Sequence, residues 1–266
     1  MNSPSATVLA VIGGGNMGAA LAGGLLSSGI VSESSLVIVE TLTDRRRALN
    51  EMYPHLPIVA TIPPCTEAVV AVKPPDVVTA ARDAVTAGAR RVLSIAAGIT
   101  IAGLEEACGP DVAVVRAMPN TPSLVGQGAS AIAGGRWATE NDMVWAESIL
   151  GSVGLVVRVV ESDLDAVTGL IGSGPAYLFL VAESLMEAGR AQGLDDDVVD
   201  SMVRQLFTGA AALMAEGDDP SDLRVRVTSP GGTTAAGLGV LDEAGVRRAF
   251  VNAVEAATAR SRELGR

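Results

Sequence analysis

The sequence predicts an α/β fold: a doubly wound, largely parallel sheet in residues 1–160, followed by an all-helical region in residues 161–266. Three observations predict it. Short β-branched apolar runs alternate with longer amphipathic stretches through residues 7–160. A glycine-rich turn directly follows the first of these runs. After about Glu161, apolar residues recur at helical spacing and no strand-like run follows.

Strands and helices alternate in the first part of the chain. Seven segments are apolar on both faces, as strands of a covered parallel sheet are. They span residues 7–13, 35–40, 67–73, 90–96, 111–117, 129–133 and 154–160. The stretches between most of them predict helices, for example 16–29, 43–52, 75–87 and 139–150. We therefore expect a parallel sheet covered by helices.

The second part of the chain has a different pattern. Residues 177–194 and 197–217 predict two long helices rich in Ala, Gly and Met, which permit close helix packing. A helical segment of about 100 residues has few internal surfaces of its own. We therefore expect burial against another subunit, with an ordinary intrachain core as the alternative.

Composition and charge exclude several classes of protein. Hydrophobic residues make up 48% of the chain, which argues against disorder, and the net charge of −11 argues against a nucleic-acid binder. Cys65 and Cys108 lack CxxC spacing, so we expect no disulfide scaffold, no metal site and a reducing cytoplasm. The N-terminal residues lack the features of a secretory signal, and no uninterrupted apolar run of about 18 residues predicts a membrane span.

The stretch VIGGGNMG has glycines in the G-x-G-x-x-G pattern, directly after a predicted strand and at the start of a predicted helix. Gly13 would permit a tight turn, Gly15 would let the main chain approach a pyrophosphate, and Gly18 would let helix and strand pack closely. The first turn of the helix, with Asn16 and Met17, would supply N–H groups to the phosphates. This pattern predicts a Rossmann-type NAD(P)-binding domain; a glycine turn that serves packing alone is the alternative.

The residues after the second strand leave the choice of dinucleotide open. Glu40 lies about 20 residues after the last glycine, where an acid bonds the adenosine ribose and favours NADH over NADPH. Residues that could hold a 2′-phosphate follow it closely: Thr41, Thr43, Arg45, Arg46 and Arg47. The arginines are also consistent with a solvated first helical turn.

Four further motifs come in a specific order. AVKP (71–74) and SIAAG (94–98), the latter followed by RAMPNTP (116–122), end predicted strands, where an open α/β sheet binds ligands. TGLIGSGPAY (168–177) and SPGGTT (229–234) follow in the helical part. Together with the glycine motif, these stretches resemble the Δ1-pyrroline-5-carboxylate reductase family over nearly the whole chain.

The resemblance implies an N-terminal Rossmann domain and a C-terminal dimerisation domain in which the helices of two subunits interleave, often in a ring of five dimers. It implies reduction of a cyclic imine to L-proline by NADPH or NADH. The cofactor contacts it implies are Gly15, Asn16, Met17, Val72, Lys73, Pro74, Ala97, Met118 and Asn120. The substrate contacts it implies are Ser229, Gly231, Gly232, Thr233, Thr234 and Glu161. Departures from the family pattern are Glu40, a shortened segment 57–65, and Arg226.

SPGGTT also has a physical interpretation as a helix start. Pro230 suits the first helical turn and Ser229 suits the N-cap, so the following N–H groups would face a substrate carboxylate. The Thr234 hydroxyl would then bond the ring nitrogen. In TGLIGSGPAY, Gly172 and Gly174 before Pro175 also predict a helix start, for which we favour a structural role over a catalytic one.

Few residues are available for acid–base chemistry. The single histidine, His55, is expected at the surface, and Lys73 is the only lysine. Lys73 could lie near the nicotinamide ribose, pair with an acid, or be solvated. A protonated imine needs orientation more than a strong acid, so the shortage favours imine reduction. Two rival hypotheses are a hydroxy-acid dehydrogenase with Lys73 as general base and a non-catalytic dinucleotide sensor.

Overall fold

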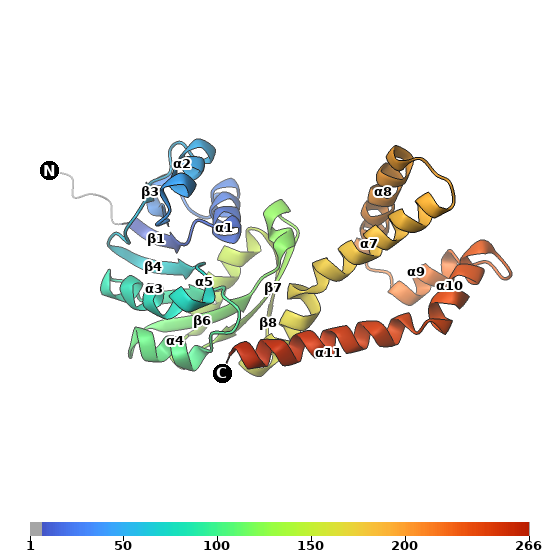
Figure 1. Ribbon diagram of the computed structural model, residues 1–266. Coiled ribbons are helices and arrows are strands. Elements are labelled where there is room, and N and C mark those ends of the chain that lie inside the picture. The colour runs from blue at the N-terminus through green and yellow to red at the C-terminus, as the bar shows by residue number, and fades with distance from the viewer. Residues whose placement is uncertain (1–6, 266) are drawn as a thin grey trace. The chain divides into compact units, whose positions relative to one another are not determined.

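The computed structural model describes residues 7–265, which form two compact units (Figure 1). The first unit runs to Ser173 and also contains the C-terminal residues from Glu255, and the second unit is Gly174–Val254. The predicted boundary at residues 160 and 161 therefore differs from the division in the structure. The reason is that residues 161–173 pack on the sheet, with Leu164 fully buried in its core.

The first unit is built on a sheet whose strands run in the order β3-β2-β1-β4-β5-β6-β7-β8 (Figure 1). The strands are β1 (Thr7–Ile12), β2 (Leu36–Val39), β3 (Ile58–Val59), β4 (Cys65–Val70), β5 (Arg91–Ser94), β6 (Ala113–Met118), β7 (Gly128–Gly134) and β8 (Gly154–Arg158). Pairs from β3 to β6 are parallel, β7 runs antiparallel to β6, and β8 is parallel to β7. The seven predicted strands are confirmed, with bounds that differ by a few residues.

Sequence reasoning did not predict β3, which has two residues and is flanked by prolines. Both faces of the sheet are buried, as expected for a doubly wound fold. Alternate residues of β1 enter opposite apolar clusters, Ala10 and Ile12 in one and Leu9 and Val11 in the other.

The helices of this unit are α1 (Asn16–Ser27), α2 (Thr43–Met52), α3 (Pro74–Thr86), α4 (Ile101–Cys108), α5 (Glu140–Gly151) and α6 (Leu164–Val167). One apolar cluster contains Val77 of α3 and Leu104 of α4, and the other contains Leu21 of α1 and Ile149 of α5. Leu164 of α6 belongs to the first cluster and Leu49 of α2 to the second, so three helices pack on each face of the sheet. A short 3-10 turn, Glu161–Asp163, precedes α6, and a π-helix, Thr168–Gly172, follows it.

The second unit is helical throughout, as predicted. It contains α7 (Gly174–Ala191), α8 (Asp196–Ala215), α9 (Pro220–Arg226), α10 (Thr233–Glu243) and the first part of α11 (Val246–Leu264). Within the single chain, many large apolar side chains of these helices are exposed, among them Phe179 at 63% and Met202 at 67%. An apolar groove of about 820 Å³ runs between α8 and α9. Such surfaces are typical of helices that another subunit covers.

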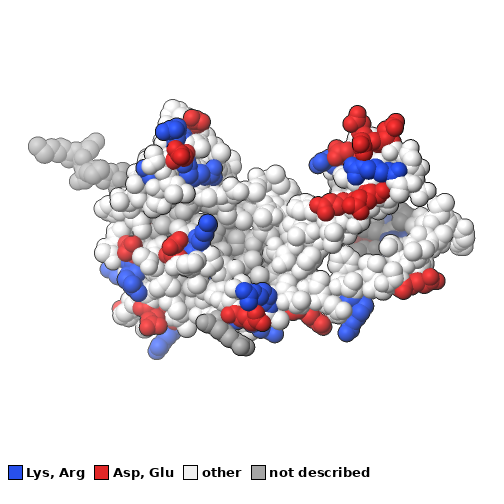
Figure 2. All heavy atoms as spheres, viewed as in Figure 1, with Lys and Arg blue, Asp and Glu red and all other residues white. Residues whose placement is uncertain are grey.

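One helical stretch, Glu161–Ala191, is long and apolar enough to cross a membrane by length and composition, and 11% of its most apolar window is buried. Sequence reasoning expected no such stretch, because glycines and charges interrupt it; in the structure it is a succession of a 3-10 turn, α6, a π-helix and α7, and Ser173 lies between the last two. Its α7 part carries exposed apolar side chains of the second unit. Figure 2 shows basic side chains interspersed with acidic ones on the face it displays.

Candidate active site

The carboxyl ends of β1 and β4, where the strand order reverses, are where an open α/β sheet binds ligands. Main-chain hydrogen bonds continue beyond the strands and hold the connecting loops together at this edge. They run from Gly13 N to Val39 O (2.8 Å), from Ala71 N to Ile12 O (2.7 Å) and from Ile95 N to Val70 O (3.1 Å). The glycine loop, the AVKP motif and the SIAAG motif therefore meet at one edge.

The three motif glycines have different surroundings. Gly13 has a φ of +105°, and a Cβ there would lie 2.6 Å from the main-chain oxygen of Ala71. A Cβ on Gly18 would overlap the carbonyl oxygen of Gly13. A Cβ on Gly15 would meet nothing within 4 Å, so open space lies above this residue. Gly13 and Gly18 thus serve the fold, and Gly15 leaves room for a ligand.

The first turn of α1 faces the same loop. Its first helical hydrogen bond runs from Ala19 N to the Gly15 carbonyl (3.0 Å), so the N–H groups of Asn16, Met17 and Gly18 precede the helical ladder. A helix N-terminus and an adjacent space fit the pyrophosphate of a dinucleotide. These residues therefore fit the cofactor that the sequence motif predicts.

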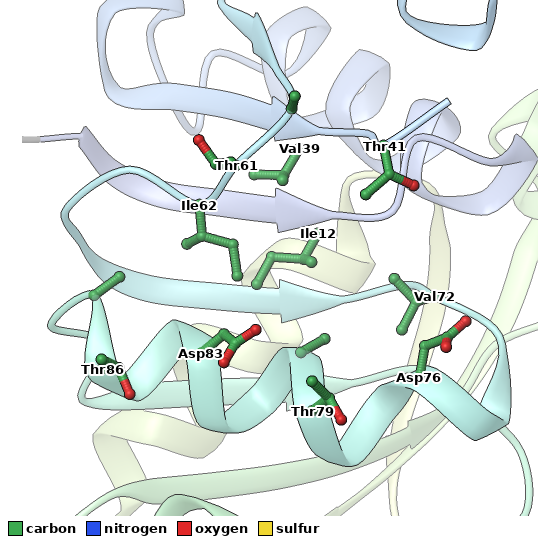
Figure 3. Close-up of a pocket in the computed structure, with 13 residues that line it drawn as sticks. Ile12, Val39, Thr41, Thr61, Ile62, Val72, Asp76, Thr79, Asp83 and Thr86 are labelled. Carbon is green, nitrogen blue, oxygen red and sulfur yellow. The ribbon is translucent and has the colours of Figure 1, made fainter. Parts of the chain in front are cut away.

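A groove of about 740 Å³ extends from this edge along α3 (Figure 3). Its lining comes from the ends of β1, β2 and β4, from residues 60–62 and from one face of α3. Ile12, Val39 and Val72 supply apolar contact, whereas Asp76 and Asp83 of α3 supply negative charge. Val72 is the residue of the AVKP motif that lines it.

Lys73 is the N-cap residue of α3, with Pro74 at the first helical position. Its side chain is exposed, and no ion pair of Lys73 occurs within residues 7–265. The interpretation that Lys73 pairs with an acid is therefore not supported in the described chain. Lys73 thus lies at the carboxyl edge of the sheet, directly after Val72, which lines the groove.

Asn120 connects two of the predicted motifs and strand β7. Its Oδ1 accepts from Ala129 N (2.8 Å), and its Nδ2 donates to the carbonyl of Ile171 (3.1 Å). Ile171 belongs to the π-helix, which is closed by a hydrogen bond from Ser173 N to Thr168 O (2.9 Å). Sequence reasoning placed Asn120 beside the cofactor but did not detect this structural bond. A π-helix has no pattern of residues that would have revealed it.

Met118 packs against the same π-helix. A Cβ on Gly172 would lie 2.6 Å from the Met118 Cε. A side chain at the first glycine of the GSG sequence would therefore displace the end of the Met118 side chain. The structural interpretation of this motif remains a prediction. Ala97 lies half-buried in the loop after β5, directly before Gly98, whose φ is +79°.

Replacing Asn120 by Asp is expected to destabilise the first unit. The carboxylate retains an acceptor for Ala129 N but presents a second acceptor to the Ile171 carbonyl, where a donor is needed. The free energy of unfolding should fall by about 1–3 kcal/mol, as measured by urea denaturation. Asn50→Asp on the exposed side of α2 is the control. If Asn120→Asp and Asn50→Asp have equal free energies of unfolding, the result would contradict a stabilising role of the hydrogen bond from Asn120 to Ile171.

Glu161 joins three elements of the first unit. Its Oε1 accepts from Ile101 N (2.7 Å) at the start of α4 and from the guanidinium of Arg116 (3.0 Å) on β6. The Arg116 side chain is only 7% exposed, and that of Glu161 is 35% exposed. The predicted substrate role of Glu161 remains a prediction. The structure adds a second role, which is to neutralise a buried arginine.

Glu161→Gln is expected to lower the free energy of unfolding by about 1–3 kcal/mol, because the buried Arg116 loses its counter-charge. The partial exposure of Glu161 keeps the effect below that of a fully buried pair. Chemical denaturation measures it, with the exposed Glu106→Gln as control. A raised KM for the imine in Glu161→Gln, beyond the loss of stability, would support the substrate role. Unchanged stability would contradict the role of the pair.

SPGGTT lies in the second unit, and its helix starts later than predicted. The proposed N-cap at Ser229 is wrong, because Ser229 O accepts from Gly232 N (3.0 Å) across a β-turn in which Gly231 has a φ of +69°. Pro230 and Gly231 are the central residues of this turn. The N-cap is Gly232 and α10 begins at Thr233. The prediction failed because proline followed by glycine suits a turn as well as a helix start.

The shift leaves a helix N-terminus at the threonines. The first helical hydrogen bond of α10 runs from Ala236 N to Gly232 O (3.1 Å), so the N–H groups of Thr233, Thr234 and Ala235 precede the ladder. Thr233 and Thr234 are exposed. The predicted cofactor residues thus all lie in the first unit, whereas the predicted substrate residues lie in the second unit except for Glu161.

Two family models and several known proteins match this chain. Residues 161–264 match the family model described as pyrroline-5-carboxylate reductase dimerisation, and residues 8–98 match the model described as NADP oxidoreductase coenzyme F420-dependent. The chain is 40% identical to the pyrroline-5-carboxylate reductase of Corynebacterium melassecola, over 98% of this chain and 99% of that relative. The chain belongs to the pyrroline-5-carboxylate reductase family. The resemblance in its motifs is thereby confirmed.

Solved structures of pyrroline-5-carboxylate reductases share the fold over the full length. The enzyme from Coxiella burnetii aligns with a TM-score of 0.90 and 31% identity, covering 98% of this chain and 100% of that chain. The Plasmodium falciparum enzyme, described with NADP bound, aligns with a TM-score of 0.85 and 30% identity, each chain being covered completely. The match to a dimerisation model also supports homo-oligomerisation through the helical region.

Proposed function

We propose that this protein reduces Δ1-pyrroline-5-carboxylate to L-proline with NADPH or NADH, the last step of proline biosynthesis. The observation that carries the proposal is the open space over Gly15 at the N-terminus of α1, in a chain of this family. That geometry fits a dinucleotide pyrophosphate. A bound reduced nicotinamide supplies the hydride, which is added to the carbon of the C=N bond.

The residues of the second unit hold the imino acid in this proposal. The N–H groups at the start of α10 receive its carboxylate, and the Ser229–Gly232 turn lets it approach closely. The Thr234 hydroxyl accepts a hydrogen bond from the protonated ring nitrogen and orients the imine carbon. Since the substrate arrives protonated, the chain needs no strong acid. The exposed Lys73 ammonium supports the ribose at the nicotinamide end.

The proposal includes assembly in the cytoplasm as a homodimer, with five dimers as the larger form. The exposed apolar side chains of α7 and α8 are the surfaces that a second copy would cover, including Phe179, Leu206 and Leu213. Analytical ultracentrifugation of the purified protein measures the size of the assembly. A monomer at micromolar concentration would contradict this part of the proposal.

A direct assay tests the activity. Purified protein is mixed with pyrroline-5-carboxylate and either NADH or NADPH, and the absorbance of the reduced nicotinamide is followed. We expect oxidation that depends on the imine, with L-proline as the product. No oxidation with either dinucleotide would contradict the function. If the protein oxidises a hydroxy acid and the Lys73→Met variant does not, the result would instead support the dehydrogenase hypothesis. Binding of a dinucleotide without any turnover would support the sensor hypothesis.

A further inference from the structure

The carboxylate of Glu40 is held in one orientation at the end of β2. Its Oε2 accepts from Gly14 N (3.1 Å), which lies within the glycine loop, and its Oε1 accepts from Leu42 N (2.8 Å). The side chain is half-buried. Two main-chain donors from separate loops thus fix a negative charge beside the position that the glycine motif provides for a dinucleotide.

This geometry suits an unphosphorylated adenosine ribose. Hydroxyl groups of a ribose can donate to a carboxylate in this position. A 2′-phosphate instead carries a charge of about −1.5 to −2 and needs donors. One donor of the loop after β2, the Leu42 N–H, is already bonded to Glu40. A phosphate there would meet a carboxylate and a main-chain group that is already paired.

Two of the three arginines after β2 are bonded to the main chain. Arg45 Nε donates to the carbonyl of Gly14 (2.6 Å). A guanidinium nitrogen of Arg46 donates to the carbonyls of Glu40 (3.0 Å) and Thr41 (2.6 Å). These bonds stabilise the two loops that position the carboxylate. The donors in these bonds therefore support the loops around Glu40 and are not available to a phosphate.

The third arginine and the groove beside this loop both have acids next to them. Arg47 is 71% exposed and lies 3.7 Å from Asp44. The groove that begins at Thr41 is lined by Asp76 and Asp83, and no Lys or Arg is among its lining residues (Figure 3). The 2′-phosphate of NADPH would therefore lie near negatively charged side chains, Glu40 first of all.

We propose that Glu40 makes this chain prefer NADH to NADPH. The assignment rests on the proposed function, because it names which dinucleotide the same site takes. It goes against the NADP described for the Plasmodium falciparum relative. The Glu40 carboxylate bonds the ribose hydroxyls of NADH and repels the 2′-phosphate of NADPH.

Binding of NAD⁺ and NADP⁺ without imine tests the proposal independently of turnover. Isothermal titration calorimetry of wild type should give an affinity for NAD⁺ roughly tenfold or more above that for NADP⁺. In Glu40→Gln this ratio should fall by about tenfold or more, because the charge is removed while an acceptor remains. Glu40→Ala should shift the ratio in the same direction. Glu51→Gln, which removes an exposed charge from α2, should leave the ratio unchanged.

Several results would overturn the proposal. Tighter binding of NADP⁺ by wild type would do so, as would an unchanged ratio in both Glu40 variants. If wild type prefers NADP⁺ and Arg46→Gln removes that preference, the arginines hold the phosphate instead. Each of these results leaves the reductase function intact. Failure to bind either dinucleotide would overturn both the preference and the proposed function.

Discussion

Gly15→Val is expected to fold with the stability of wild type and to bind NAD(P)H about 100-fold more weakly. A Cβ at this position meets no atom within 4 Å, and the φ of −63° is one that valine adopts readily, so we expect the folded chain to accommodate the substitution. The valine side chain would fill the space where the pyrophosphate approaches the N–H groups of α1. Loss of two charge-assisted hydrogen bonds accounts for an effect of this size.

Fluorescence titration of NADH, together with thermal unfolding, measures the two parts of this expectation. The matched comparison is Gly13→Ala, in which a Cβ would lie 2.6 Å from the Ala71 carbonyl oxygen at a φ of +105°. That variant should unfold at lower temperature, because both backbone and packing oppose the side chain. Normal dinucleotide affinity in Gly15→Val would show that the pyrophosphate lies elsewhere.

Thr234→Ala is expected to lower kcat/KM for pyrroline-5-carboxylate by roughly 10- to 100-fold. A hydrogen bond to a charged group is worth about 1.5–3 kcal/mol, and the alanine variant leaves the ring nitrogen without its acceptor. The N–H groups of α10 are unaffected, so the carboxylate contact should persist. Steady-state kinetics at saturating NADH measures the change, and Thr234→Ser should recover most of the activity because it restores the hydroxyl.

The control for this prediction is Thr208→Ala. The Thr208 hydroxyl is exposed on α8 and bonds the carbonyl of Arg204 in its own helix (3.1 Å). Its loss should not alter the kinetics. Kinetics of Thr234→Ala equal to those of wild type would remove Thr234 from the mechanism.

Most of the architecture follows from local patterns. Alternation of strand-like and helix-like segments predicted the covered parallel sheet, since a strand buried on both faces needs continuous apolar sequence. The glycine motif predicted the position of the cofactor loop, because Gly13 and Gly18 meet close neighbours that a side chain would exclude. Helical spacing after Glu161 predicted the helical second unit. These features can be predicted because each depends on residues that are near one another in the sequence.

Contacts between distant residues decided the remainder. Glu161 reaches Arg116 and Ile101, and Asn120 reaches Ile171, through hydrogen bonds between residues at least 45 positions apart. No periodicity encodes such pairs, because each depends on how separate elements pack. The Pro230–Gly231 turn is a different case, because its closing hydrogen bond is local and the sequence there is compatible with either a turn or a helix start.

Glu40 shows the division most clearly. The sequence places an acid and three arginines after β2 and leaves open whether they favour NADH or NADPH. The tertiary structure brings Gly14 N–H to the Glu40 carboxylate and turns Arg45 and Arg46 onto main-chain carbonyls. Fold class and motif positions are therefore properties of the local sequence. The electrostatic environment of the adenosine ribose is set by tertiary packing, because only packing decides which main-chain groups the charged side chains bond.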